Sequence, residues 1–186
     1  MSESRSLAGK FLLAMPGMGD PRFERAAIAM FIHDSEGALG IGLGRERDDL
    51  SLHDLLEDLE IDPGAAPDLP VLDGGPVEQQ RGFVLHTPDW HAPGTIVAPG
   101  LCALSGSLEV LRAIATGRGP SHYLVALGYA GWGAGQLDDE LRRHGWGAVD
   151  GSEAVLWDCP AEDRWRACWQ SAGIDPALLS SQTGRA

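Results

Sequence analysis

The chain has 186 residues, of which 44% are hydrophobic and 22% charged, a composition typical of a folded globular protein rather than a disordered one. Its 14 basic and 27 acidic residues give a formal net charge of −13, and the basic residues are scattered rather than clustered. This negative field repels nucleic-acid backbones and anionic membrane surfaces, so we expect neither as a partner.

The first half of the chain predicts a β-hairpin followed by a helix. Apolar runs at residues 26–33 and 37–44 are separated by the turn-forming stretch DSEG, which is typical of a hairpin. Residues 51–60 predict a helix with Ser51 as N-cap and Asp54 as its capping-box partner. Its apolar stripe consists of Leu52, Leu55, Leu56 and Leu59.

The second half predicts further strands and helices. A helix begins at the N-cap Ser107, and residues 122–130 predict a strand. Residues 135–145 predict a helix with acidic residues in its first turn and basic residues in its last. Residues 152–159, SEAVLWDC, predict a strand. The last helix, residues 161–173, carries a stripe formed by Trp165, Cys168, Trp169 and Ala172.

The mixture of strands and helices sets the fold class. Residues 61–70 form too short a connection for a domain boundary, and short strands follow between residues 70 and 105. The early hairpins favour an α+β fold over a doubly wound parallel sheet. We expect one compact domain over residues 1–186, with residues 1–6 as a flexible tail.

The glycine-rich stretch GYAGWGAGQL, residues 128–137, has the composition of a phosphate cradle but not its spacing. Its glycines do not match the dinucleotide motif, and no lysine follows Lys10, which excludes a Walker loop. The next helix opens with three carboxylates, each of which would repel a bound phosphate by about 1–4 kcal/mol. We therefore expect a tight strand-to-helix corner, with Trp132 packed in the core or lining a groove.

Four long stretches carry a family resemblance. They are GKFLLAMPGMGDPRFERA, GGPVEQQRGFVLH, LGYAGWGAGQLDDEL and GIDPALLS, in this order along nearly the whole chain. In these stretches the chain resembles the AlgH/YqgE family of bacterial proteins. The resemblance implies a compact α+β fold in which a branched, mixed or antiparallel sheet curls into a barrel-like core flanked by helices. It also implies a cytosolic protein described as a regulator, without an established biochemical activity.

The chain departs from the family pattern at two polar motifs. Where the family has Cys-Glu-His, this chain has Phe31, Ile32 and His33. Where the family has Ile-Asn-Arg-Pro, residues 43–46 read Leu-Gly-Arg-Glu and keep only Arg45. The loss of the Cys, Glu and Asn argues against a catalytic constellation here.

The cysteines and the apolar runs indicate the cellular compartment in which we expect the protein. The chain has three cysteines without a CxxC pair, and it shows neither a secretory apolar region nor a run of about 20 apolar residues. These features are typical of free thiols in a reducing compartment, so we expect a cytoplasmic protein without a membrane span.

The candidate site residues are His33, Arg45 and His86, with Arg81 and Trp132 as further candidates. An imidazole beside a guanidinium suits a small anion or carboxylate, since arginine binds such groups with a bidentate fork. In the alternative interpretation, His33 caps a strand and Arg45 pairs with an acidic side chain.

A second grouping, His86, Asp89 and His91, has the residue types of a metal site. We nevertheless expect no metal, because His86 ends a predicted strand whereas the other two lie on a proline-containing loop. No cofactor motif is present.

The leading hypothesis is a non-enzymatic regulatory protein that binds an unidentified small molecule or protein partner. One alternative is an enzyme with a pocket around His33, Arg45 and His86, which requires these side chains to converge. A second is a DNA-binding regulator, which the net charge of −13 disfavours.

Overall fold

The computed structural model describes residues 5–17, 21 and 23–182 of the chain. The strands are β1 (Lys10–Ala14), β2 (Ala27–Asp34), β3 (Gly37–Gly42), β4 (Glu46–Ser51), β5 (Pro70–Asp73), β6 (Val77–His86), β7 (Ile96–Ala98), β8 (Cys102–Ser105), β9 (Tyr123–Gly133) and β10 (Trp146–Asp150). The helices are α1 (Leu52–Asp58), α2 (Leu108–Ala115), α3 (Gln136–Arg142), α4 (Glu153–Asp158), α5 (Arg164–Ser171) and α6 (Pro176–Gln182), with a 3-10 turn at Ala161–Asp163.

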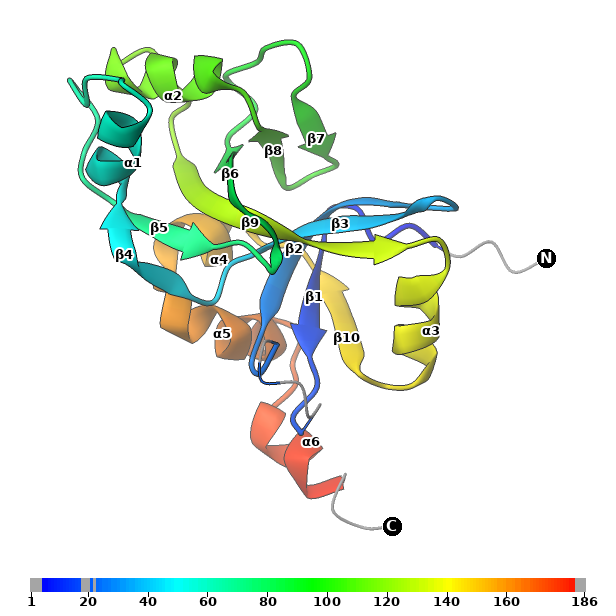
Figure 1. Cartoon of the computed structure of the whole chain (residues 1–186). Helices are drawn as coiled ribbons and strands as arrows, with labels where there is room; N and C mark the ends of the chain where they lie inside the picture. The colour runs from blue at the N-terminus through cyan, green and yellow to red at the C-terminus, as the bar shows by residue number, and fades with distance from the viewer. Residues whose placement is uncertain (1–4, 18–20, 22, 183–186) are drawn as a thin grey trace.

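The strands form one branched sheet that curls into a half-barrel (Figure 1). Its main path runs β10-β1-β2-β3-β9-β6-β8-β7, and β4 and β5 branch from it because β5 pairs with β9. All pairings are antiparallel except that of β5 with β9. The predicted α+β class, with a branched sheet in a single compact domain, is confirmed.

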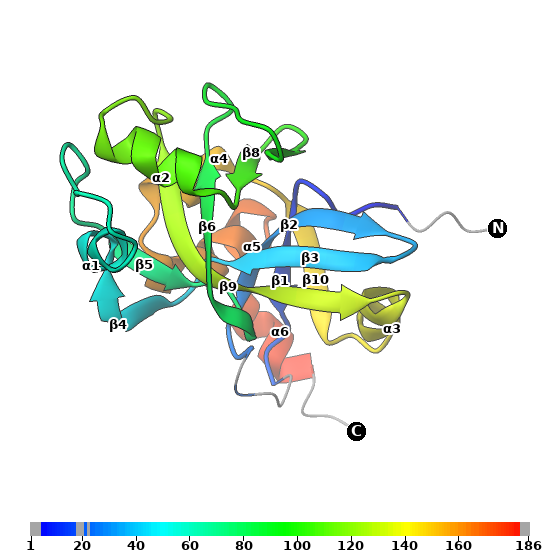
Figure 2. The same cartoon turned by 45° about the horizontal axis from the view of Figure 1, so that its top comes forward.

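Strand β9 holds the two halves of this sheet together. Its first half pairs with β6 and its last four residues pair with β3. The strand therefore spans the molecule from α2 at one end to α3 at the other (Figure 2). The change of partner falls at Gly128, whose φ of 79° is in the left-handed region that favours glycine.

Glycines allow three strands to touch where β9 changes partner. Gly74 donates to the carbonyl of Leu127 and accepts from the amide of Gly42, both at 2.8 Å. A Cβ on Gly74 would lie 2.2 Å from the carbonyl oxygen of Gly128, and one on Gly75 would lie 2.2 Å from the carbonyl carbon of Tyr129. Any side chain here would overlap backbone atoms, so this crossing of β3, β5 and β9 requires glycine.

Helices α4 and α5 pack on the face formed by β1, β2 and β9 (orange in Figure 1). As predicted, α5 buries Trp165, Cys168 and Trp169, and the indole of Trp165 donates to the Ala14 carbonyl at 2.9 Å. On the other face, α1 and α2 cover β5, β6 and β9 with residues such as Leu56. Ser51 and Asp54 form the predicted capping box.

Arg164, at the start of α5, is a buried cation that ties the C-terminal helices to the sheet. Its guanidinium donates to the carbonyls of Leu43 at 2.8 Å, Leu156 at 3.1 Å and Val155 at 3.2 Å. Only 5% of the residue is exposed, and burial lowers the pKa of its guanidinium. The charge is thus held by carbonyl dipoles from α4 and from the end of β3.

The strand predicted over residues 152–159 is wrong. Residues Glu153–Asp158 form α4, in which the hydroxyl of Ser152 caps the helix by accepting from the amide of Val155. Strand β10 ends just before this helix, at Asp150, where it pairs with β1. The apolar run of this segment is typical of a strand, but the serine before it marks the start of a helix.

Two other predictions, those on the glycine-rich stretch and on Leu59, need smaller corrections. The glycine-rich stretch is mostly strand, because β9 continues to Gly133 and leaves only Ala134 and Gly135 in the corner. Leu59 is 38% exposed, because α1 ends at Asp58. Of the predicted N-terminal tail, residues 1–4 lie outside the described part of the chain, while the Ser6 hydroxyl donates to the His33 carbonyl at 3.1 Å.

The glycine crossing yields a stability prediction. We expect Gly75→Ala to lower the free energy of unfolding by about 2–5 kcal/mol, because the new Cβ overlaps backbone and the φ of 149° disfavours alanine. Gly82→Ala is the matched control, since its Cβ would meet only the Leu127 side chain at 3.8 Å. Urea unfolding measures both variants, and equal losses in the two would contradict a steric role for Gly75.

Candidate functional site

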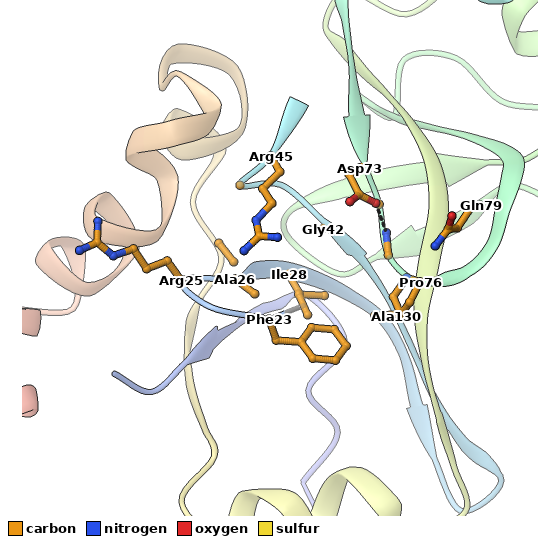
Figure 3. A pocket seen from close by; sticks show the side chains of 14 residues that line it. Phe23, Arg25, Ala26, Ile28, Gly42, Arg45, Asp73, Pro76, Gln79 and Ala130 are labelled. Atoms are coloured by element: carbon orange, nitrogen blue, oxygen red, sulfur yellow. Dashed lines mark hydrogen bonds between the residues drawn. The ribbon is translucent and has the colours of Figure 1, made fainter. Parts of the chain in front are cut away.

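The main candidate site is a groove beside the glycine crossing, with a cavity volume of about 190 Å³ (Figure 3). Its lining is apolar except for a few polar side chains. We call it the Arg45 groove and define it by Phe23, Ile28, Arg45, Asp73, Gln79 and Ala130. It lies where β2, β3, β5 and the start of β6 approach one another, so the close strand contact also forms the site.

Arg45 follows β3 and points into this groove (Figure 3). Its Nη2 donates to the carbonyl of Glu24 at 3.1 Å and to that of Pro21 at 3.3 Å. Among the described residues, no acceptor bonds to its Nε or Nη1, and no carboxylate forms an ion pair with it. Among the described residues, Arg45 therefore does not pair with an acidic side chain, as the alternative interpretation expects.

Asp73, at the end of β5, lies next to Arg45 on the border of the groove (Figure 3). Its Oδ1 accepts from the amide of Gly75 at 3.3 Å, while its own amide donates to the Arg45 carbonyl at 2.8 Å. The backbone thus fixes the two residues side by side, whereas their charged groups stand apart. Sequence reasoning missed Asp73 and Gln79, although Asp73 directly precedes the GGPVEQQ stretch that carries the family resemblance and Gln79 lies within it.

A second arginine of the groove lining, Arg25, is oriented differently. Its side chain points away from the groove (Figure 3), and its guanidinium lies over the ring of Trp165, 5.7 Å from the centroid. Arg45 is therefore the cation that a ligand in the groove would meet.

His33 lies at a separate place, near α3. Its Nδ1 accepts from the amide of Leu7 at 3.1 Å, and its Nε2 is 3.3 Å from Oδ1 of Asp138. The residue is 9% exposed. On β2, His33 is five residues from Ile28, which pairs with Gly42 beside the groove, and this distance is roughly 17 Å along the strand.

His86 is also remote from the groove and fully buried. Its Nδ1 donates to the Thr87 carbonyl at 2.8 Å, since a carbonyl can only accept, and Nε2 therefore accepts from the Ser105 hydroxyl at 2.8 Å. It pairs with Tyr123 at the start of β9, roughly 30 Å along that strand from Trp132. Burial lowers the pKa of His86, so the imidazole is a neutral core group.

The carboxylate of Asp89 is used by a loop rather than by a metal. It accepts from Ser121 and Thr87, and these hydrogen bonds, from Ser121 first, lower its pKa. Within the described chain, no three His, Cys, Asp or Glu side chains are grouped as metal ligands.

Arg81 and Trp132 have different surroundings again. Arg81 is exposed and donates to Glu78 at 3.2 Å. Its guanidinium lies over the ring of Phe83, and the residue lines two further hollows of about 110 and 220 Å³.

Trp132 is 7% exposed, and its indole donates to Oε2 of Glu140 at 3.0 Å. Trp146 donates to the same oxygen at 2.8 Å, so Glu140 joins β9 and β10 through two indoles.

The five predicted residues thus do not line one pocket. Arg45 lines the Arg45 groove, Arg81 lines the two further hollows, and His33, His86 and Trp132 are held by hydrogen bonds elsewhere in the fold. The three side chains of the enzyme alternative, His33, Arg45 and His86, do not converge.

The chain is an α+β protein with a branched half-barrel sheet in which β9 is shared by both halves. The AlgH-like family model matches residues 11–177, and the chain belongs to this family. A protein of Novosphingobium aromaticivorans named UPF0301 protein is 60% identical over the full length of both chains, and one of Rhizorhabdus wittichii is 54% identical over the same span. The family has no specific established function.

Solved structures agree with this fold. The solution structure of the AlgH protein from Pseudomonas aeruginosa is 38% identical, with a TM-score of 0.81 over 100% of this chain and 99% of that one. A crystal structure of a Corynebacterium diphtheriae protein shares the fold at 20% identity and a TM-score of 0.75, covering 97% and 94% of the two chains. Within the described residues of this chain, no helix has the length and apolarity that crossing a membrane requires.

The buried His86 yields a pH prediction. Because burial lowers its pKa below 6.5 in the folded state, the unfolded chain binds the proton more readily. Above pH 6.5 the titration of His86 does not reduce the free energy of unfolding. As the pH falls below 6.5, the free energy of unfolding decreases, by at most about 1.4 kcal/mol per pH unit.

Urea unfolding between pH 8 and pH 5 measures this dependence. We expect His86→Gln to have a shallower slope than wild type, and His144→Gln, which removes an exposed histidine that is not among the groups acting on His86, to keep the wild-type slope. Parallel curves for wild type and His86→Gln would show that His86 does not carry the dependence.

Proposed function

We propose that this protein is a binding protein that holds a small ligand in the Arg45 groove and acts through that ligand as a regulator. The observation that carries the proposal is the guanidinium of Arg45, which projects into an apolar groove with two nitrogens free of described partners. A cavity with an apolar lining and a few convergent polar groups is the usual form of a small-molecule site.

The chemistry of the groove supports binding rather than catalysis. Its described lining contains no His, Cys, Ser, Thr, Tyr or Lys, which leaves the carboxylate of Asp73 as its one described group of the kind that transfers protons or attacks as a nucleophile. Elsewhere, burial raises the pKa of Cys102 and of Cys168 to about 12, so both thiols stay protonated and unreactive at neutral pH. The three cysteines are free, which supports the proposal of a cytoplasmic protein.

The proposal does not include DNA as a partner. The net charge of −13 opposes a phosphate backbone, and the exposed arginines Arg81 and Arg142 are each paired with a carboxylate. A protein partner that reads the liganded groove would provide the regulatory output.

A melting screen tests the ligand site. The screen measures the midpoint of thermal unfolding with organic acids, amino acids, sugar phosphates and nucleotides. At 100 times its dissociation constant, a ligand adds about 2.7 kcal/mol to the free energy of unfolding and raises the midpoint by roughly 5–10 °C. We expect Arg45→Ala to abolish the shift, because it removes the cation of the groove.

Arg142→Ala is the matched control. It also removes one arginine, but from an exposed pair with Asp139 on α3. We expect it to keep the ligand-induced shift. A shift that survives Arg45→Ala places the ligand elsewhere, and a screen without any shift would overturn the small-ligand role in favour of a protein partner alone.

A further inference from the structure

We propose that the ligand of the Arg45 groove is a zwitterion of the free α-amino-acid type, with its carboxylate on Arg45 and its ammonium on Asp73. This inference rests on the proposed function and names the ligand class for the same site. It is motivated by two exposed side chains of opposite charge that line one groove and form no ion pair with each other.

The cationic side of the groove suits a carboxylate. Two backbone carbonyls, of Pro21 and Glu24, hold Nη2 of Arg45 and so orient the guanidinium. Its Nε and Nη1 have no acceptor among the described residues, so either nitrogen can donate a charge-assisted hydrogen bond to one oxygen of a carboxylate. A side chain already oriented by the backbone loses little entropy when a ligand binds.

The anionic side of the groove suits a ligand that also donates hydrogen bonds. Asp73 accepts one bond from the Gly75 amide, and it forms no ion pair within the described chain. A carboxylate has about four acceptor positions, so most of its capacity remains available. An ammonium group would donate to these acceptor positions, and the side-chain amide of Gln79 lies near the Asp73 carboxylate (Figure 3).

The remaining lining sets the size and polarity of the ligand. Phe23, Ile28 and Ala130 provide an apolar surface for a hydrocarbon side chain. A volume of about 190 Å³ lies below the usual range of drug-sized pockets and matches a molecule on the scale of an amino acid. The backbone of Gly42, Gly74 and Gly75 forms the wall of the groove at the strand crossing.

Asp73 also distinguishes this ligand class from a simple anion. A phosphate or a monocarboxylate on Arg45 would approach the Asp73 carboxylate without neutralising it, in a protein whose net charge is already −13. The ammonium group of a zwitterion removes this repulsion. The preference for zwitterions should therefore depend on Asp73, while the binding of any carboxylate should depend on Arg45.

Three matched probes test this assignment. L-leucine is the zwitterion, 4-methylpentanoate is leucine without its ammonium, and 3-methylbutylamine is leucine without its carboxylate. Amide chemical shifts of the labelled protein report binding, and the amides of Gly42, Gly74 and Gly75 report the groove itself. We expect leucine to shift these amides with an affinity at least about tenfold above that of either single-charge probe.

Two variants and a control complete the experiment. We expect Asp73→Asn to lower the affinity for leucine about tenfold and to bring it close to that of 4-methylpentanoate, whereas Arg45→Lys weakens both carboxylate probes. Asp139→Asn, on the exposed face of α3, should leave all affinities unchanged. The amide spectra of each variant also show whether it is folded.

The outcomes separate the two proposals. If 4-methylpentanoate binds as well as leucine and Asp73→Asn changes neither, the zwitterion is wrong while the ligand groove stands. Binding of the amine alone would overturn the role assigned to Arg45 for the carboxylate. If none of the probes shifts the groove amides, the amino-acid class is excluded, and the broader melting screen alone decides whether the groove binds any ligand.

Discussion

The structure depends on one shared strand, since β9 is hydrogen-bonded to β6 over its first half and to β3 at its end. A strand can change partners in this way only where its backbone bends without steric cost. Gly128 supplies that bend, and Gly74 and Gly75 let β5 run directly against it. Each of the three apolar cores contains residues of β9, so the packing of the helices follows from the course of this strand.

The same constraint produces the groove. Where β3, β5 and β9 meet through bare backbone, no side chains fill the space above the crossing, and the surrounding residues border a cavity. Arg45 and Asp73 stand on this border because their backbones are joined by a hydrogen bond of 2.8 Å. The glycines that allow the strands to cross thus also leave a groove, and the charged side chains of Arg45 and Asp73 line it.

Much of the fold could be predicted from local patterns in the sequence. The hairpin of β2 and β3, the capping box at Ser51 and the Trp stripe of α5 depend on neighbouring residues, and all three are confirmed. The convergence of side chains depends on long-range register, which the sequence does not display. Arg45 is a candidate from the sequence because it is the residue kept from a polar family motif, whereas Asp73 joins it only through the pairing beside β4 and β5.

The contact of Arg164 with Leu43 has a consequence for how the protein is made in the cell. The two residues are 121 positions apart, and the contact of Trp165 with Ala14 spans 151. At typical rates of synthesis, a ribosome needs about 6–24 s to add the residues between Leu43 and Arg164. For most of that interval the nascent β1–β3 segment lacks β9 and β10, the strands that pair with its two edges, and α5, which packs on its face. The first strands to be synthesised therefore wait for the last third of the chain before their sheet is complete.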